Sequence, residues 1–156
     1  MQNISPFLWF NNNAEEAINF YVSLFKNSRI TKTVRCGDAG PGPKGSVLTM
    51  EFELDGLQLV ALNGGPHYSF TPAISLAISC ETQAEVDRLW DSLVAGGKPV
   101  QCGWLEDKYG LSWQVVPTIL PKLLADPDPK KAARAMQAMM KMVKLDIAEL
   151  EKAANG

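Results

Sequence analysis

Hydrophobic and polar residues in the first part of the chain follow two periods, one typical of strands and one of a helix. Residues 4–10 are rich in aromatic and β-favouring side chains, and the asparagines at 11–13 end that run. From Ala14 onward, apolar side chains recur every three or four positions. Asp55-Gly56 separates two alternating runs and is a strong hairpin signal. We therefore predict a strand over 4–10, a helix over 14–25 and strands over 29–36, 46–54 and 57–63.

The same order of elements restarts after a connector at residues 64–72 that is rich in glycine and proline. Thr82 and Glu85 have the spacing of a capping box and predict the start of a helix, which Gly96-Gly97 ends. Shifting the chain by 69 residues places the strand that begins at Ile4 over one that begins at Ala73, and the two helices over each other. Two amphipathic helices can match by chance, but the repeated order favours an internal duplication. The predicted elements are strands over 73–80, 100–105 and 111–116 and a helix from 82 to 95.

The last part of the chain has a helical pattern of its own. After a break at residues 126–129, an apolar stripe continues for about twenty residues, formed by Ala132, Met136, Met139, Met140, Val143, Ile147 and Leu150. We expect this methionine-rich face to pack against the domain or against a second copy of the chain. The alternative is a regulatory or membrane-surface helix.

The net charge and the hydropathy of the chain limit the classes of partner and the cellular location that we expect. The chain has 156 residues, with 15 Lys and Arg against 17 Asp and Glu, a net charge of −2. This balance gives no basic surface for nucleic acid, so we expect none as a partner. No apolar run approaches the roughly 18 residues of a membrane span, and the N-terminus does not resemble a secretion signal. We therefore expect a cytoplasmic protein with no membrane partner.

Histidine and cysteine limit the chemistry. With His67 as the single histidine, any mechanism or metal site that needs two imidazoles is excluded. His67 lies in the connector, where it either anchors the loop or acts as a general base. Cys36, Cys80 and Cys102 form no CxxC motif, and we interpret them as buried, reduced packing residues.

A glycine motif and three tryptophans are the remaining candidates for chemistry. Residues 40–45 match G-x-G-x-x-G, but their two prolines remove amide donors and a strand follows, so we reject a nucleotide site. No glycine-rich turn opens a βαβ unit, so nothing marks a site for S-adenosylmethionine. Trp9, Trp104 and Trp113 lie in predicted strands, where they fill a core or line a concave small-molecule site.

Several motifs together resemble one family: residues 6–10, 14–17, 63–66, 70–72, 83–90 and 102–117. They are similar to the PhnB-like branch of the vicinal oxygen chelate superfamily, also called the 3-demethylubiquinone-9 3-methyltransferase domain. The resemblance extends from Ile4 to Pro117 and into the methionine-rich segment. It implies an α+β fold in which two βαβββ modules, about 4–63 and 73–117, form a curved mixed sheet cup within a domain at 1–117. A C-terminal helical extension at 118–156 would follow, and a homodimer is implied.

The resemblance also implies where metal-dependent relatives hold their ion. Those positions fall at Pro6, near Ser75, at 61–63 and at Gln114, and none of them is His, Glu or Asp. Neutral ligands bind divalent ions weakly, so we expect no catalytic metal and no cofactor. The predicted ligand-binding residues, at these positions or beside them, are Pro6, Leu8, Trp9, Asn63, Ser75, Trp104 and Gln114.

Three functions remain open at this point. The first is binding of a small organic molecule in the sheet cup without a metal. The second is an enzyme of lyase, isomerase, dioxygenase or methyltransferase type. The third is an interaction protein in which the dimer and the tail matter more than the cup.

Overall fold

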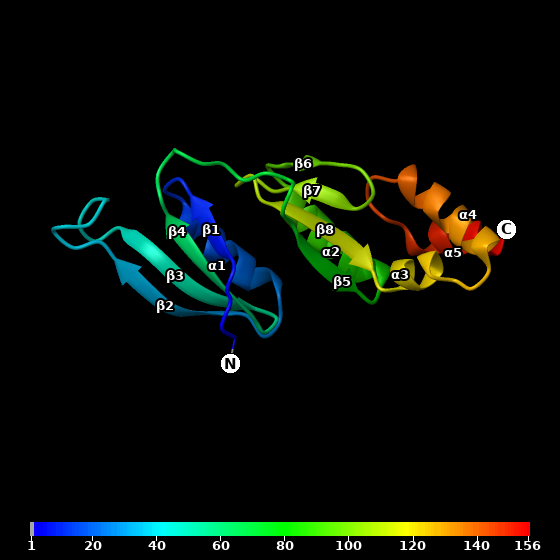
Figure 1. Ribbon diagram of the computed structural model, residues 1–156, viewed down its shortest axis with the longest axis horizontal. Coiled ribbons are helices and arrows are strands. Elements are labelled where there is room, and N and C mark those ends of the chain that lie inside the picture. Colours follow the sequence, from blue (N-terminus) through cyan, green and yellow to red (C-terminus); the bar gives the residue numbers. More distant parts are fainter. Residues whose placement is uncertain (1) are drawn as a thin grey trace. The chain divides into compact units, whose positions relative to one another are not determined.

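The computed structural model describes residues 2–156, and the chain divides into two compact units, Met1–Phe70 and Thr71–Gly156 (Figure 1). The first unit contains β1 (Phe7–Phe10), α1 (Ala14–Leu24), β2 (Arg29–Arg35), β3 (Val47–Leu54) and β4 (Leu57–Asn63). The second contains β5 (Leu76–Cys80), α2 (Gln83–Val94), β6 (Lys98–Pro99), β7 (Trp104–Glu106), β8 (Ser112–Pro117), α3 (Ile119–Leu124), α4 (Pro129–Met140) and α5 (Ile147–Asn155).

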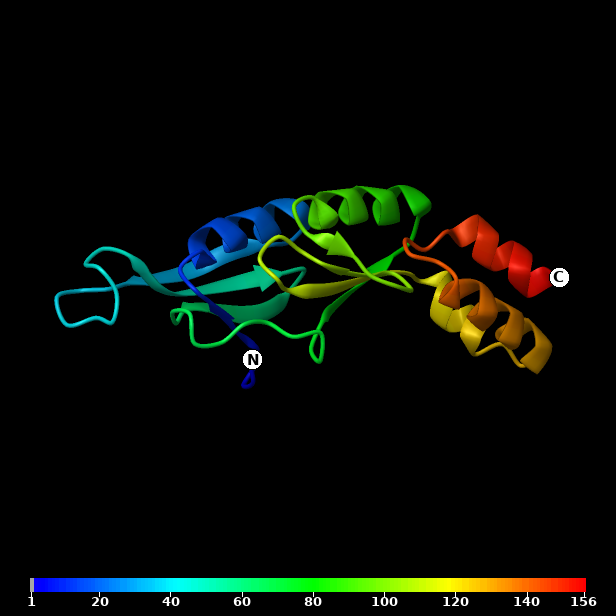
Figure 2. The ribbon, with the colours of Figure 1, turned by 90° about the horizontal axis from the view of Figure 1, so that it is seen from above.

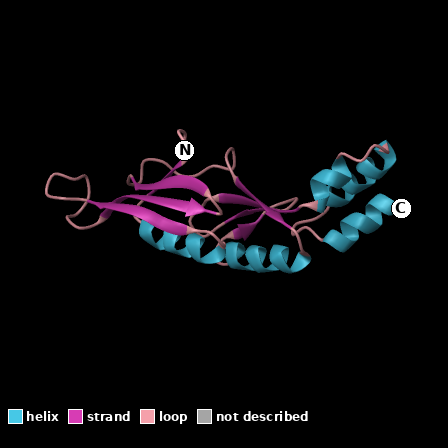
Figure 3. Cartoon of the chain, turned by 90° about the horizontal axis from the view of Figure 1, so that it is seen from below, coloured by secondary structure: helices cyan, strands magenta, loops and turns pink. Residues whose placement is uncertain are grey.

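Each unit contains one βαβββ module with the same topology. The strand orders are β1-β4-β3-β2 and β5-β8-β7-β6, and the first two strands of each order are parallel while the others are antiparallel. One long helix, α1 or α2, lies across one face of each sheet (Figure 2 and Figure 3). The predicted α+β class with two βαβββ modules is confirmed.

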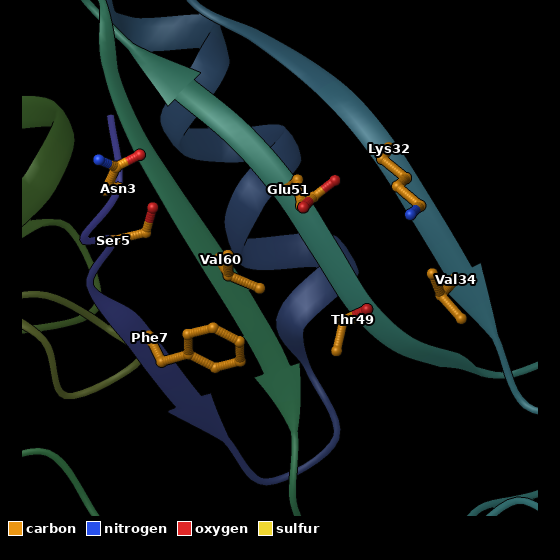
Figure 4. A pocket seen from close by; sticks show the side chains of 8 residues that line it. All are labelled: Asn3, Ser5, Phe7, Lys32, Val34, Thr49, Glu51 and Val60. Atoms are coloured by element: carbon orange, nitrogen blue, oxygen red, sulfur yellow. The ribbon is translucent and has the colours of Figure 1, made fainter. Parts of the chain in front are cut away.

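Alternation along the strands of the first unit separates a core face from an open face. Leu8 and Phe10 are buried, whereas Phe7, the residue before Leu8 in β1, is 63% exposed and points to the face of the sheet opposite α1 (Figure 4). Tyr21 of α1 is fully buried against the core face. The face of the sheet opposite α1 is therefore the one that can receive a ligand.

The second unit differs from the prediction at one strand. Instead of a single strand over 100–105, the structure has β6 and β7 with a turn between them, in which the Val100 N–H donates to the Trp104 carbonyl at 2.8 Å. The predicted capping box is confirmed, because the Thr82 hydroxyl accepts from the Glu85 N–H at 3.2 Å.

The two modules match each other with a shift that changes along the chain. The helices follow the predicted shift of 69 residues, which pairs Tyr21 with Trp90, both buried. The strands do not, because residues 11–13 connect β1 to α1 whereas only residues 81 and 82 connect β5 to α2. Phe10 therefore corresponds to Cys80, and a slip of one residue moves side chains to the other face of a sheet.

The C-terminal extension contains three helices that pack together (Figure 3). The prediction of one helix of about twenty residues is wrong, because α4 ends at Met140 and α5 begins at Ile147. The linker between them is bound by the rest of the unit: the Met142 and Val143 carbonyls accept from the amides of residues 102 and 103 at 2.8 and 2.7 Å. Asp146 then caps α5 by accepting from the Glu149 N–H.

An ion pair also joins this linker to α2. Lys144 Nζ lies 2.9 Å from Asp87 Oδ1 of α2. The hydrogen bonds from Lys144 and from Gln83 lower the pKa of Asp87, and the bond to Asp87 raises the pKa of Lys144. Both groups are exposed, so the pair positions the linker more than it stabilises the fold.

The three cysteines differ in exposure. Cys36 and Cys80 are buried as predicted, Cys102 is partly exposed, and all three are free thiols. Burial, the largest cause, raises the pKa of Cys80 to about 11, so this thiol stays protonated at neutral pH.

Within residues 2–156, no helix has both the length and the apolar character needed to cross a bilayer.

Candidate functional site

A hollow of about 390 Å³ lies on the open face of the first sheet (Figure 4). It is lined by side chains from β1 to β4 and from the segment that precedes β1: Asn3, Ser5, Phe7, Lys32, Val34, Thr49, Glu51 and Val60. Its volume lies within the range of small-molecule sites, and it combines apolar surface with a few polar groups.

Strand pairing explains why these side chains meet. Lys32, Glu51, Val60 and Phe7 form one row, because each is the direct Cα partner of the next on the neighbouring strand. Direct partners in a sheet point to the same face. The row therefore runs from charged side chains on β2 and β3 to apolar side chains on β4 and β1.

A second hollow of about 220 Å³ adjoins the first at its polar end and shares Ser5, Glu51 and Val60 with it. Glu53 in this second hollow is already paired with Arg29, whose Nε lies 3.2 Å from Oε2. Of the two carboxylates on this face of β3, Glu51 is therefore the one left for a ligand.

Trp9 faces the open side, but residues of the connector cover it. Its indole Nε1 donates to the Gly65 carbonyl at 2.9 Å, and the Tyr68 ring meets it edge-on with 4.9 Å between the ring centroids. A Cβ atom at Gly64 would lie 2.6 Å from Cδ2 of Trp9. Trp9 thus closes one end of the open face and is not among the residues that line the hollow.

Three of the predicted ligand-binding residues lie toward α1. Leu8 is only 5% exposed and is part of the core. The Asn63 side chain accepts from the Ala14 N–H and donates to the Val47 carbonyl, both at 3.0 Å, so it holds the start of α1. Pro6, two positions before Leu8, shares its side by alternation.

The other three predicted residues come together on the open face of the second sheet. Gln114 Nε2 donates to Ser75 Oγ at 3.0 Å, and Trp104 is the Cα partner of Gln114. Their roles as ligand-binding residues stay predictions. His67, the other sequence candidate, lies exposed in the connector and outside the hollow.

The residues at the positions that the resemblance implies for a metal do not fit a divalent ion. Pro6 has no side-chain donor atom, and Asn63, Ser75 and Gln114 use their side chains in the hydrogen bonds described above. Within the described part of the chain, no three His, Cys, Asp or Glu side chains are grouped so that they could hold a metal. The donor set lacks the charge that would offset dehydration of the ion.

None of the residues predicted to bind a ligand lines this hollow. The signal for Glu51 was present, since residues 51 and 53 alternate onto one face of a predicted strand. The signal for Lys32 and Val34 was the alternation in 29–36. To place Lys32 beside Glu51, one must know how β2 pairs with β3. That pairing has an irregularity between Ile30 and Lys32, which the alternation of residues does not reveal.

Comparison with known proteins agrees with this architecture. The family model for 3-demethylubiquinone-9 3-methyltransferase matches residues 2–116. A PhnB protein from Bacillus cereus is 38% identical, covering 75% of this chain and 100% of its own, with a TM-score of 0.71. Protein PA1353 from Pseudomonas aeruginosa is 22% identical, covering 75% of this chain and 98% of its own, with a TM-score of 0.63. Among curated proteins, none matches this chain.

The family model ends at residue 116, so α3, α4 and α5 lie beyond it, whereas the sequence resemblance was expected to continue into the methionine-rich segment. The matched residues include the whole first βαβββ module and all of the second module except Pro117, the last residue of β8. The chain therefore belongs to the 3-demethylubiquinone-9 3-methyltransferase family, the PhnB-like branch of the vicinal oxygen chelate superfamily.

Proposed function

We propose that this protein binds a small organic molecule in the hollow on the open face of the first sheet, without a catalytic metal. The observation that carries the proposal is the hollow of about 390 Å³, which has Lys32 and Glu51 at one side and Phe7 and Val60 at the other. Such a mixture of apolar wall and few polar groups is typical of small-molecule sites. A third hollow, of about 400 Å³ beside the loop at 37–46, is lined by no charged residue and offers less to orient a ligand.

Methyl transfer, which the family's name suggests, has less support in these residues. The turns from β1 to α1 and from β5 to α2 consist of residues 11–13 and 81–82, none of them glycine. A close approach of backbone amides to a nucleotide-like cofactor usually needs glycine there. The residues present thus do not fit S-adenosylmethionine at either turn.

Phe7→Ala tests the hollow. Removing the ring is expected to weaken binding of the apolar anionic probe 8-anilinonaphthalene-1-sulfonate about fivefold, because ligand and ring no longer bury each other's apolar surface. The probe's fluorescence titration measures this. Since Phe7 is 63% exposed, the thermal midpoint should hardly change.

Leu57→Ala is the matched control, because Leu57 is a 44% exposed apolar residue of the same unit that does not line the hollow. Its probe affinity should equal that of the wild type. Equal affinity of the Phe7→Ala and wild-type proteins would count against the hollow as the site.

Self-association is a second candidate role, favoured by the surface of α4. Met136 and Met140 are 41% and 62% exposed, and Val143 in the following linker is 41% exposed. Met139, in contrast, packs on the cluster of Leu120, Leu145 and Leu150. The predicted stripe thus divides into a buried part and an exposed part, and the exposed part would fit a second copy of the chain.

The variant Met136→Lys with Met140→Lys tests this role. If a homodimer uses this surface, two buried charges should weaken the dimer at least tenfold, as measured by sedimentation velocity over a concentration series. Asn19→Lys adds a charge at an exposed position of α1, outside this surface, and should leave the dimer intact. A double variant that dimerises like the wild type would exclude this surface as the interface.

A further inference from the structure

The charges of the hollow narrow the class of ligand. Lys32 and Glu51 are its two charged lining residues, and they are direct Cα partners on β2 and β3. Across residues 2–156, neither has an ion-pair partner within 4.0 Å. The neighbouring pair on the same two strands, Arg29 and Glu53, does form an ion pair at 3.2 Å. The hollow therefore presents one available cation and one available anion.

The separation of these charges limits the distance between the complementary groups of a ligand. Neighbouring strands lie about 5 Å apart, so partner residues hold their side chains next to each other. A ligand that meets both charges must carry an anion and a cation only a few ångströms apart. A simple acid or a simple amine would meet one of them and leave the other without a partner.

The apolar part of the hollow continues in the same direction. Val60 is the Cα partner of Glu51, and Phe7 is the Cα partner of Val60. Val34 adds apolar surface next to Lys32 on β2 (Figure 4). A ligand with its charged end between Lys32 and Glu51 would therefore place an apolar substituent over Val60 and Phe7.

We propose that the hollow binds a 2-amino carboxylic acid with an apolar side chain. Its carboxylate meets the ammonium of Lys32, its ammonium meets the carboxylate of Glu51, and its side chain lies over Val60 and Phe7. This inference rests on the proposed function, because it names the ligand class of the same hollow.

A titration of the full chain with three probes of one carbon skeleton tests it: leucine, 4-methylpentanoate and 3-methylbutylamine. Amide chemical shifts of the hollow residues report the site and the affinity. Leucine should bind about fivefold more tightly than either singly charged probe, which is the effect of one exposed charge pair. Added salt should reduce this preference, since exposed charges are screened.

Two variants separate the charges. Lys32→Met should lower the affinity for leucine and for the acid about fivefold but leave that for the amine unchanged, and Glu51→Gln should do the same for leucine and the amine. Both side chains are exposed, so the fold should persist, as a thermal melt will show. Lys26→Met and Glu16→Gln are the matched controls, because these exposed residues of the same unit do not line the hollow.

The outcomes distinguish the inference from the proposed function. Equal affinities for the three probes, or no response to leucine while the anilinonaphthalene probe binds, would overturn the amino acid class and leave small-molecule binding in place. No shift of any hollow residue with any of the four probes would overturn both. Loss of leucine binding in the control variants to the same extent would also overturn the assignment to Lys32 and Glu51.

Discussion

Gly97→Ala is expected to lower the free energy of unfolding of the second unit by about 3 kcal/mol or more. A Cβ atom at Gly97 would clash with the carbonyl oxygen of Glu106 and lie 2.7 and 2.9 Å from the C and Cα atoms of Asp107. These are backbone atoms where β6 pairs with β7, so no rotation of a side chain can relieve the contact. Urea denaturation followed by tryptophan fluorescence measures the loss.

Gly37→Ala is the control for this prediction. No heavy atom lies within 4 Å of a Cβ built at Gly37, so its unfolding free energy should stay within about 0.5 kcal/mol of the wild type. A loss at Gly97 as small as that at Gly37 would show that β6 and β7 separate at little cost.

Asp107→Ala is expected to cost about 3 to 4 kcal/mol of stability, because the buried carboxylate holds three donors. It is 2% exposed, and Oδ1 accepts from the N–H groups of Tyr109 and Leu111 at 2.9 and 3.0 Å, while Oδ2 accepts from Trp113 Nε1 at 2.8 Å. Alanine would leave these donors buried without their acceptors. The same urea denaturation measures the effect.

Two further variants show how much of this loss of stability comes from the turn amides and how much from the indole N–H. Asp107→Asn keeps an acceptor for the two turn amides but places an NH₂ group against the indole N–H, so its loss should be about half. Asp38→Ala removes an aspartate whose ion pair with Lys44 is almost fully exposed, and it should change stability little. If the Asn and Ala variants at 107 were equally unstable, the turn amides would contribute nothing to the cost.

Signals in adjacent residues were sufficient for several elements. Asp55 and Gly56 adopt φ values of 47° and 86°, as the predicted hairpin between β3 and β4 requires. Thr82 caps α2 as predicted, and the helices of both modules begin within a residue of their expected positions. These features depend on local φ/ψ preferences and on hydrogen bonds between close neighbours in the chain, which a single sequence contains.

The start of α5 had a local signal, because Asp146 and Glu149 have the spacing of an N-cap and its third helical residue, but the end of α4 had none. Residues 141–146 contain neither glycine nor proline, and their apolar spacing continues that of a helix. The helix ends because the Met142 and Val143 carbonyls are bound by residues 102 and 103, and because Leu145 is fully buried. Hydrogen bonds to a segment some forty residues away outweigh the local preference for helix.

The candidate site, too, was predictable from the sequence only in part. The periodicities and motifs of the sequence by themselves determined the duplicated βαβββ modules and the family. Only the tertiary structure decided that Asn63 holds α1, and that Lys32, Glu51, Val60 and Phe7 form one row across the sheet. The physical reason is register: one residue more between β1 and α1, or an irregular pairing of β2, moves a side chain to the other face, and hydrophobic spacing alone does not contain that information.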